Sequence, residues 1–100
     1  MNENQRRALL WAIRVSNPSD FTEEERAWLA SAQQKLEVQQ PPSPAEHRVL
    51  ADAALCAGTL LVAGFAGLDI EELPGPHPTL EDLETAQAHC EAHCLALAAV

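Results

Sequence analysis

The chain has 100 residues and carries 15 acidic against six basic side chains, a formal net charge of −9. This length supports one domain with a modest core. A negative field of this size repels nucleic acid and anionic lipid, so it argues against direct binding to either and favours basic partners.

The composition predicts helices. Hydrophobic residues make up 47% of the chain and aromatic residues only 4%, and Ala, Leu, Glu and Gln dominate. These residues lose little side-chain entropy in a helix. We therefore expect an all-α fold, a small irregular four-helix bundle that forms a single domain over residues 1–100.

The first two helices are expected before residue 38. Residues 5–15 form the first, which Asn17-Pro18 ends, because the residue before a proline disfavours helix. The second begins at Thr22, whose hydroxyl caps it with Glu25 as the partner in a capping box. Apolar residues then recur at helical spacing: Trp28, Leu29, Ala32 and Leu36.

Residues 39–43 contain two adjacent prolines, which predict an extended linker. A third helix follows, from Pro44 to about Phe65. Ser43 is its expected cap and Glu46 its capping-box partner, with Pro44 at the first helical position, which proline tolerates.

The fourth helix is expected to begin after its cap, Thr79, and to reach Ala98. The connection before it is rich in proline and acid, with one short turn over residues 70–73. Short links between helices favour antiparallel neighbours. One arrangement is therefore two helical hairpins, residues 5–38 and 44–100, joined at Pro41-Pro42.

The segment Ala53–Leu68 is 16 residues long and has no charged side chain. A membrane span needs roughly 20 apolar residues, so we expect a buried core helix and no membrane partner. The polar N-terminus has no long apolar region of the secretory type. The protein is expected to be cytoplasmic, with its three cysteines as free thiols.

His89, Cys90, His93 and Cys94 form the string with most potential for chemistry. Residues four apart share a helix face, so the histidines form one pair and the cysteines another. The cysteines fall on the apolar stripe of the helix. Because zinc needs convergent ligands and the sequence shows no second cluster, no metal and no cofactor are expected. A metal-dependent regulator built on His89 and His93 stays open as an alternative.

The sequence offers no catalytic residues. It has no phosphate-binding glycine loop, no catalytic triad signature and no metalloenzyme motif. Cys56 lies in the apolar segment, where burial would raise the pKa of its thiol and make it inert. We therefore expect a protein that is not an enzyme.

The charges are distributed unevenly. All six basic residues lie at or before Arg48, and residues 49–100 carry eight acids. Acids in the first turn of a helix stabilise its dipole, which accounts for only some of them. The candidate partner-binding residues are therefore the acids of both halves: Asp20, Glu23, Glu24, Asp69, Glu71, Glu72, Glu81, Asp82 and Glu84.

These acid clusters, Asp20 with Glu23–Glu25 and Asp69 through Glu84, sit on a short helical chain without catalytic motifs. In that general type the chain resembles phage-encoded anti-CRISPR proteins. The resemblance implies a protein that binds and inhibits a basic nucleic-acid-handling complex, such as a CRISPR surveillance complex, by placing carboxylates on its Lys and Arg sites. The chain departs from proteins that mimic nucleic acid over their whole surface by carrying Arg6, Arg7, Arg14 and Arg26. We therefore expect an acidic patch with ordinary contacts beside it.

Self-association is the other open alternative. The face of Ala53–Leu68 carries the small residues Ala54, Gly58, Ala63 and Gly67, which would let two helices approach closely. A helical scaffold or adaptor could use this face as a homodimer interface.

Overall fold

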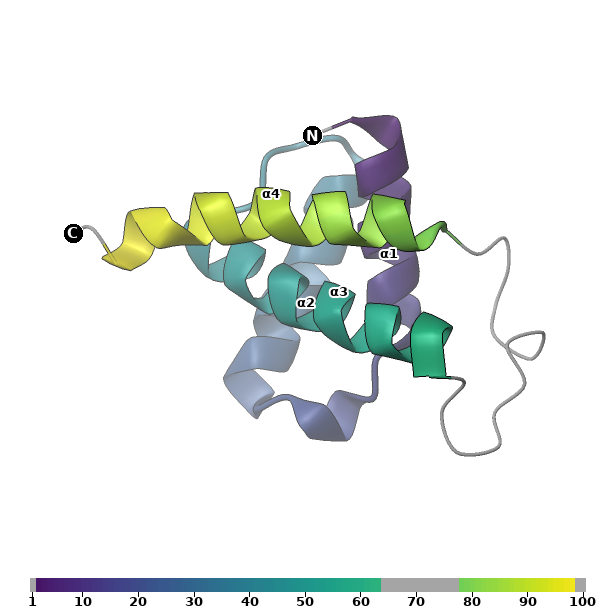
Figure 1. Ribbon diagram of the computed structural model, residues 1–100. Coiled ribbons are helices and arrows are strands. Elements are labelled where there is room, and N and C mark those ends of the chain that lie inside the picture. The colour runs from purple at the N-terminus through teal and green to yellow at the C-terminus, as the bar shows by residue number, and fades with distance from the viewer. Residues whose placement is uncertain (1, 64–77, 99–100) are drawn as a thin grey trace.

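A computed structural model describes residues 2–63 and 78–98 of the chain. In these residues it contains α-helices, one short 3₁₀ helix and no strand, which confirms the all-α prediction (Figure 1). The elements are α1 (Glu3–Val15), η1 (Pro18–Asp20), α2 (Glu23–Glu37), α3 (Pro44–Ala63) and α4 (Leu80–Ala98). The predicted end of the third helix at Phe65 and the turn over residues 70–73 lie outside the described residues.

The helix starts follow the capping signals. Thr22 Oγ1 accepts a hydrogen bond from the Glu25 backbone N–H at 3.1 Å, and the Glu25 carboxylate accepts one from the Thr22 N–H at 2.9 Å. Thr79 Oγ1 accepts one from the Asp82 N–H at 3.1 Å. Helix α1 begins two residues earlier than predicted because Asn2 caps it in a capping box that sequence reasoning missed.

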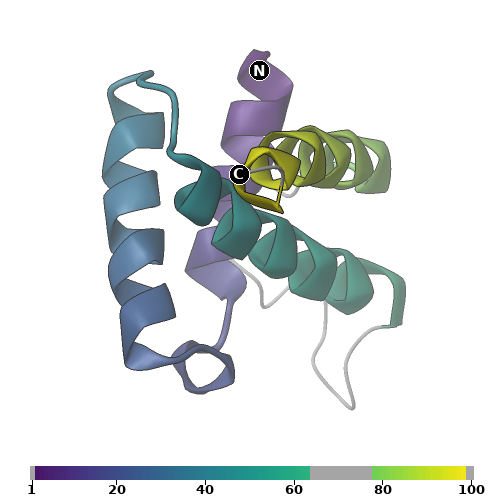
Figure 2. The same ribbon diagram turned by 90° about the vertical axis from the view of Figure 1, so that its left-hand side faces the viewer.

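Helices α3 and α4 run antiparallel along each other and share the largest helix–helix contact (Figure 1). Helix α1 lies across both, and α2 packs mainly against α3 (Figure 2). This antiparallel packing brings the first turn of α3 beside the second half of α4, although the two segments are far apart in the sequence.

The core lies where the four helices meet, and its fully buried large residues come from each of them: Leu9, Leu36, Val49, Leu50 and Leu83. Small residues on α3 let α4 approach. Ala54 is 1% exposed, and a Cβ added at Gly58 would lie 3.8 Å from Leu80 Cδ1. This half of the small-residue stripe therefore packs inside the molecule.

The other two small residues of that stripe are Ala63 and Gly67. The side chain of Ala63 and all of Gly67 lie outside the described part of the structure. As for the membrane, none of the helices in the described residues combines the length and the apolar character that a spanning segment needs.

Candidate metal centre

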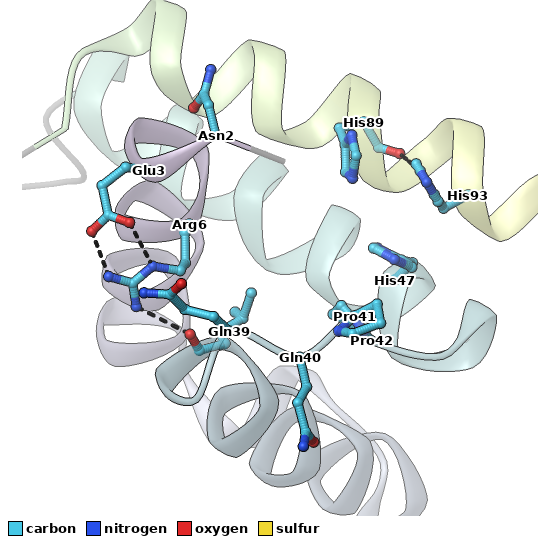
Figure 3. Close-up of a pocket in the computed structure, with 11 residues that line it drawn as sticks. Asn2, Glu3, Arg6, Gln39, Gln40, Pro41, Pro42, His47, His89 and His93 are labelled. Atoms are coloured by element: carbon cyan, nitrogen blue, oxygen red, sulfur yellow. Dashed lines mark hydrogen bonds and ion pairs between the residues drawn. The ribbon is translucent and has the colours of Figure 1, made fainter.

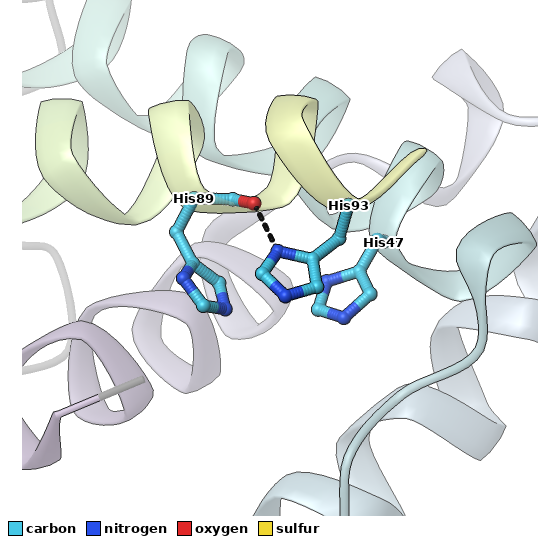
Figure 4. Close-up of side chains that lie close together, drawn as sticks. All are labelled: His47, His89 and His93. Atoms are coloured by element: carbon cyan, nitrogen blue, oxygen red, sulfur yellow. Dashed lines mark hydrogen bonds between the residues drawn. The ribbon is translucent and has the colours of Figure 1, made fainter. Parts of the chain in front are cut away.

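Three histidine side chains converge between α3 and α4. His47 comes from the first turn of α3, and His89 and His93 come from successive turns of α4 (Figure 4). The ring centroids of His89 and His93 lie 4.1 Å apart, those of His47 and His93 4.7 Å, and those of His47 and His89 5.7 Å. Each ring offers one nitrogen, and these three nitrogens all lie within 4.8 Å of one another.

The phase of α4 places two of the three histidines. Cys90 is fully buried, as the apolar stripe predicted, and this turns the neighbouring residue His89 to the edge of the core. His89 is half-buried and His93 is exposed. The side chain of Cys94 lies outside the described residues. The four-residue spacing of the two histidines gives them a common helix face.

A hydrogen bond fixes the tautomer of His93. Its Nδ1 lies 2.8 Å from the His89 backbone carbonyl oxygen (Figure 4). A carbonyl oxygen can only accept, so Nδ1 carries the proton and donates it. The lone pair of His93 is therefore on Nε2. Holding one ring nitrogen by a backbone carbonyl while the other meets a metal is the usual arrangement of histidine ligands.

The most buried member of the cluster is His47. Its side chain is only 4% exposed, and its Nδ1 is a buried atom without a hydrogen-bond partner in the described structure. Burial lowers the pKa of His47 to about 4, with His93 and His89 contributing in the same direction. Burial and His93 also lower the pKa of His89. Both imidazoles are thus in the neutral, ligating form at pH 7.

The cluster is close to, but wider than, a closed tetrahedral site. Zn–N bonds of about 2.0–2.1 Å place two ligand nitrogens about 3.3 Å apart in a tetrahedron. The nitrogens here lie within 4.8 Å, so binding would draw the rings together by up to about 1.5 Å. Side-chain rotation can supply this movement, because His93 is on the surface and His89 is only half-buried.

An ion pair with a buried carboxylate and a partly exposed lysine holds the backbone beside His47. The Glu46 carboxylate, 4% exposed, accepts from Lys35 Nζ on α2 and from the Ser43 backbone N–H at 2.9 Å. Burial raises the pKa of Glu46, but the hydrogen bonds from Lys35 and Ser43 outweigh it and lower the pKa to about 2. The predicted Ser43–Glu46 capping box is therefore present. The ion pair of Glu46 with Lys35 also connects α3 to α2.

A pocket of about 390 Å³ adjoins the three histidines (Figure 3). Its remaining walls come from the start of α1, the end of α2 and the link before α3: Asn2, Glu3, Arg6, Leu36, Gln39, Gln40, Pro41 and Pro42. Arg6 is already paired: its Nε donates to Glu3 at 2.9 Å and its Nη1 to the Leu36 carbonyl at 3.0 Å. The charge of Arg6 is thus neutralised by Glu3 at the pocket wall.

The predicted partner-binding acids that the structure describes form two groups at two different helix starts. Asp20, Glu23 and Glu24 are exposed at η1 and the start of α2. At the start of α4, Glu81 and Glu84 are exposed and Asp82 is half-buried. These two helix starts lie apart in both views (Figures 1 and 2). The remaining three acids, Asp69, Glu71 and Glu72, lie outside the described residues.

The expected burial of Cys56 was wrong, because this thiol is on the exposed side of α3. Its pKa is nevertheless raised, by partial desolvation and by the nearby carboxylates of Asp20 and Asp52. The shift is in the direction expected from the sequence, with desolvation as its first cause and the two carboxylates as additional ones.

Sequence reasoning found two of the three histidines and missed His47. The available signal was weak: a histidine in the first turn of one helix and a histidine pair late in the next, where antiparallel packing would let them meet. Comparisons with protein-family models, with curated proteins and with solved structures find no match to this chain.

Proposed function

We propose that the protein is a non-enzymatic, cytoplasmic metal-dependent regulator that binds one divalent transition-metal ion through His47, His89 and His93. The convergence of three imidazoles from two helices carries this proposal. This convergence favours the metal-dependent regulator, which the sequence left open as an alternative built on His89 and His93. It adds His47 as a third ligand.

Zinc is the expected ion. Imidazole nitrogen suits zinc, copper and nickel better than magnesium or calcium, and zinc accepts three histidines in a tetrahedral site. Binding would join the first turn of α3 to the second half of α4. It would thereby stabilise the packing of these two helices, so that metal supply controls the folded population.

The test is zinc stoichiometry by equilibrium dialysis on protein freed of metal with chelator. We expect one tightly held zinc ion per chain. Each of His47→Ala, His89→Ala and His93→Ala should lower the affinity by at least about tenfold, because a three-ligand site loses a third of its bonds.

His77→Ala, which removes the remaining histidine of the chain, is the matched control and should bind as the unaltered protein does. Zinc affinity that is insensitive to all three cluster substitutions would refute the proposal.

A second candidate is the binding and inhibition of a basic nucleic-acid-handling partner, in the manner that the anti-CRISPR resemblance suggests. What supports it is the exposure of Glu81 and Glu84 on a helix of a chain that has no basic residue after Arg48. Such carboxylates would compete with phosphate for Lys and Arg sites.

Affinity capture at low salt, repeated at high salt, tests this candidate. A partner bound through charge should be lost at high salt and lost with the triple substitution Glu81→Gln, Asp82→Asn, Glu84→Gln. Neutralising Asp20, Glu23 and Glu24 in a separate variant shows whether the other predicted group of acids contributes to the same binding. Binding that neither salt nor the first set of substitutions changes would exclude an acidic interface on α4.

A further inference from the structure

The pocket beside the histidines indicates which kind of molecule would be the fourth ligand of the metal. This inference rests on the metal site proposed above. Among the described residues, the cluster contains three histidines and no carboxylate or thiol. A tetrahedral ion held by three protein ligands accepts its fourth from outside the chain. All three histidines line the pocket of about 390 Å³, so the fourth ligand can lie in this space (Figure 3).

The charges of the pocket indicate the sign of that ligand. Glu3 and Arg6 both line it, and they neutralise each other through an ion pair. The three histidines are neutral when they ligate. A bound divalent ion would therefore leave the pocket with a charge of about +2, which an anionic fourth ligand reduces.

The rest of the wall has a polar part, made by Asn2, Gln39 and Gln40, and an apolar part that indicates the body of the ligand. Pro41 and Pro42 line the pocket with their apolar rings, and Leu36 adds a third apolar residue. The volume is at the lower end of the range for small-molecule sites, which are mostly apolar with a few polar anchors.

We propose that the metal-bound protein takes a small organic carboxylate into this pocket, with the carboxylate on the metal and an apolar body against Pro41 and Pro42. The carboxylate oxygen supplies the anionic ligand, and the apolar body is removed from water by the two rings. No bond of the ligand is made or broken other than its coordination to the metal.

Cobalt(II) provides the test, because its visible absorption reports the number and type of its ligands. The cobalt-loaded full chain is titrated with benzoate, with acetate and with benzamide. Benzoate should change the spectrum and saturate, with an affinity at least about tenfold above that of acetate, because the ring adds apolar contact area. Benzamide has the same ring without the charge and should cause no change.

A variant pair tests the apolar wall. Pro42→Ala should weaken benzoate several-fold and leave acetate and cobalt affinity unchanged. Pro44→Ala is the matched control, because Pro44 lies two residues further on, at the start of α3, and does not line the pocket. Circular dichroism checks that both variants are folded.

The outcomes separate the two proposals. If cobalt binds through the three histidines but benzoate leaves its spectrum unchanged, or binds no better than acetate, the carboxylate pocket is wrong and the metal site stands. If cobalt does not bind, or binds equally well to the His93→Ala variant, both are wrong.

Discussion

His47 and Glu46 are adjacent in the first turn of α3, and both side chains are buried. Glu46 is directed to α2 through Lys35, whereas His47 contacts the histidine rings of α4. A buried carboxylate is stabilised only while its charge is compensated, so this ion pair fixes the backbone from which His47 projects.

Lys35→Met should lower the free energy of unfolding by about 2–3 kcal/mol, because it leaves the Glu46 carboxylate buried without its cation. Urea unfolding measures this change. The double variant Lys35→Met, Glu46→Gln should recover part of the loss, since a neutral amide is less costly to bury. Equal stabilities for the unaltered protein and Lys35→Met would show that the pair contributes nothing.

The lowered pKa of Glu46 predicts an acid-dependent loss of stability in the metal-free protein. Its pKa is about 2 when folded, against an ordinary value of 4.5, so the unfolded chain binds the proton more readily. The stabilisation is complete above pH 4.5 and is lost as the pH falls towards 2. Thermal unfolding across this range should show a component that Glu46→Gln lacks; a Glu46→Gln curve of identical shape would contradict this assignment.

The starts of individual helices are determined by capping residues that can be recognised in the sequence. Thr22, Ser43 and Thr79 each accept the hydrogen bond that capping predicts, because a cap needs only residues three apart. The side of α3 that Cys56 occupies was less predictable. Its segment is apolar all round, so periodicity does not show which side faces the core. Packing against α4, α1 and α2 decides this, and Cys56 is left exposed.

The end of α2 contains an unfavourable backbone conformation. Gln39 has a φ of 59°, and its N–H and that of Gln40 donate to the carbonyls of Leu36 and Lys35, the pattern of a Schellman cap. Glycine is the preferred residue at this position. Gln39→Gly should therefore raise the free energy of unfolding by about 0.5–1 kcal/mol.

Denaturant unfolding tests this, with Gln40→Gly as the control that places glycine next to the left-handed position. We expect no stabilisation from Gln40→Gly. A Gln39→Gly protein no more stable than Gln40→Gly would show that the left-handed conformation costs little.

The whole molecule determines the candidate site more than any single segment does. The helical class was predictable from composition, and the pair His89 and His93 from spacing. The third ligand was not, because His47 reaches them only through the antiparallel packing of α3 on α4, a relation between distant segments. The described acids differ from the histidines: their two groups, separate in the sequence, also lie at separate helix starts in the fold (Figure 1).

Zinc should stabilise the whole fold, since its ligands lie on two helices. At a free zinc concentration of about 100 times Kd, linkage predicts a gain of about 2.7 kcal/mol. For a domain of this size that raises Tm by on the order of 10 °C. Chelator should reverse the shift. A His93→Ala protein whose Tm rises equally with zinc would mean that the ion stabilises the fold from elsewhere.

X-ray absorption at the zinc edge examines the ligands themselves. For the zinc-loaded protein we predict nitrogen or oxygen neighbours at about 2.0–2.1 Å together with the outer-shell scattering of three imidazole rings. His47→Ala should reduce that imidazole contribution by one ring. A sulfur neighbour at about 2.3 Å, or fewer than three imidazoles in the unaltered protein, would contradict a metal centre made by His47, His89 and His93.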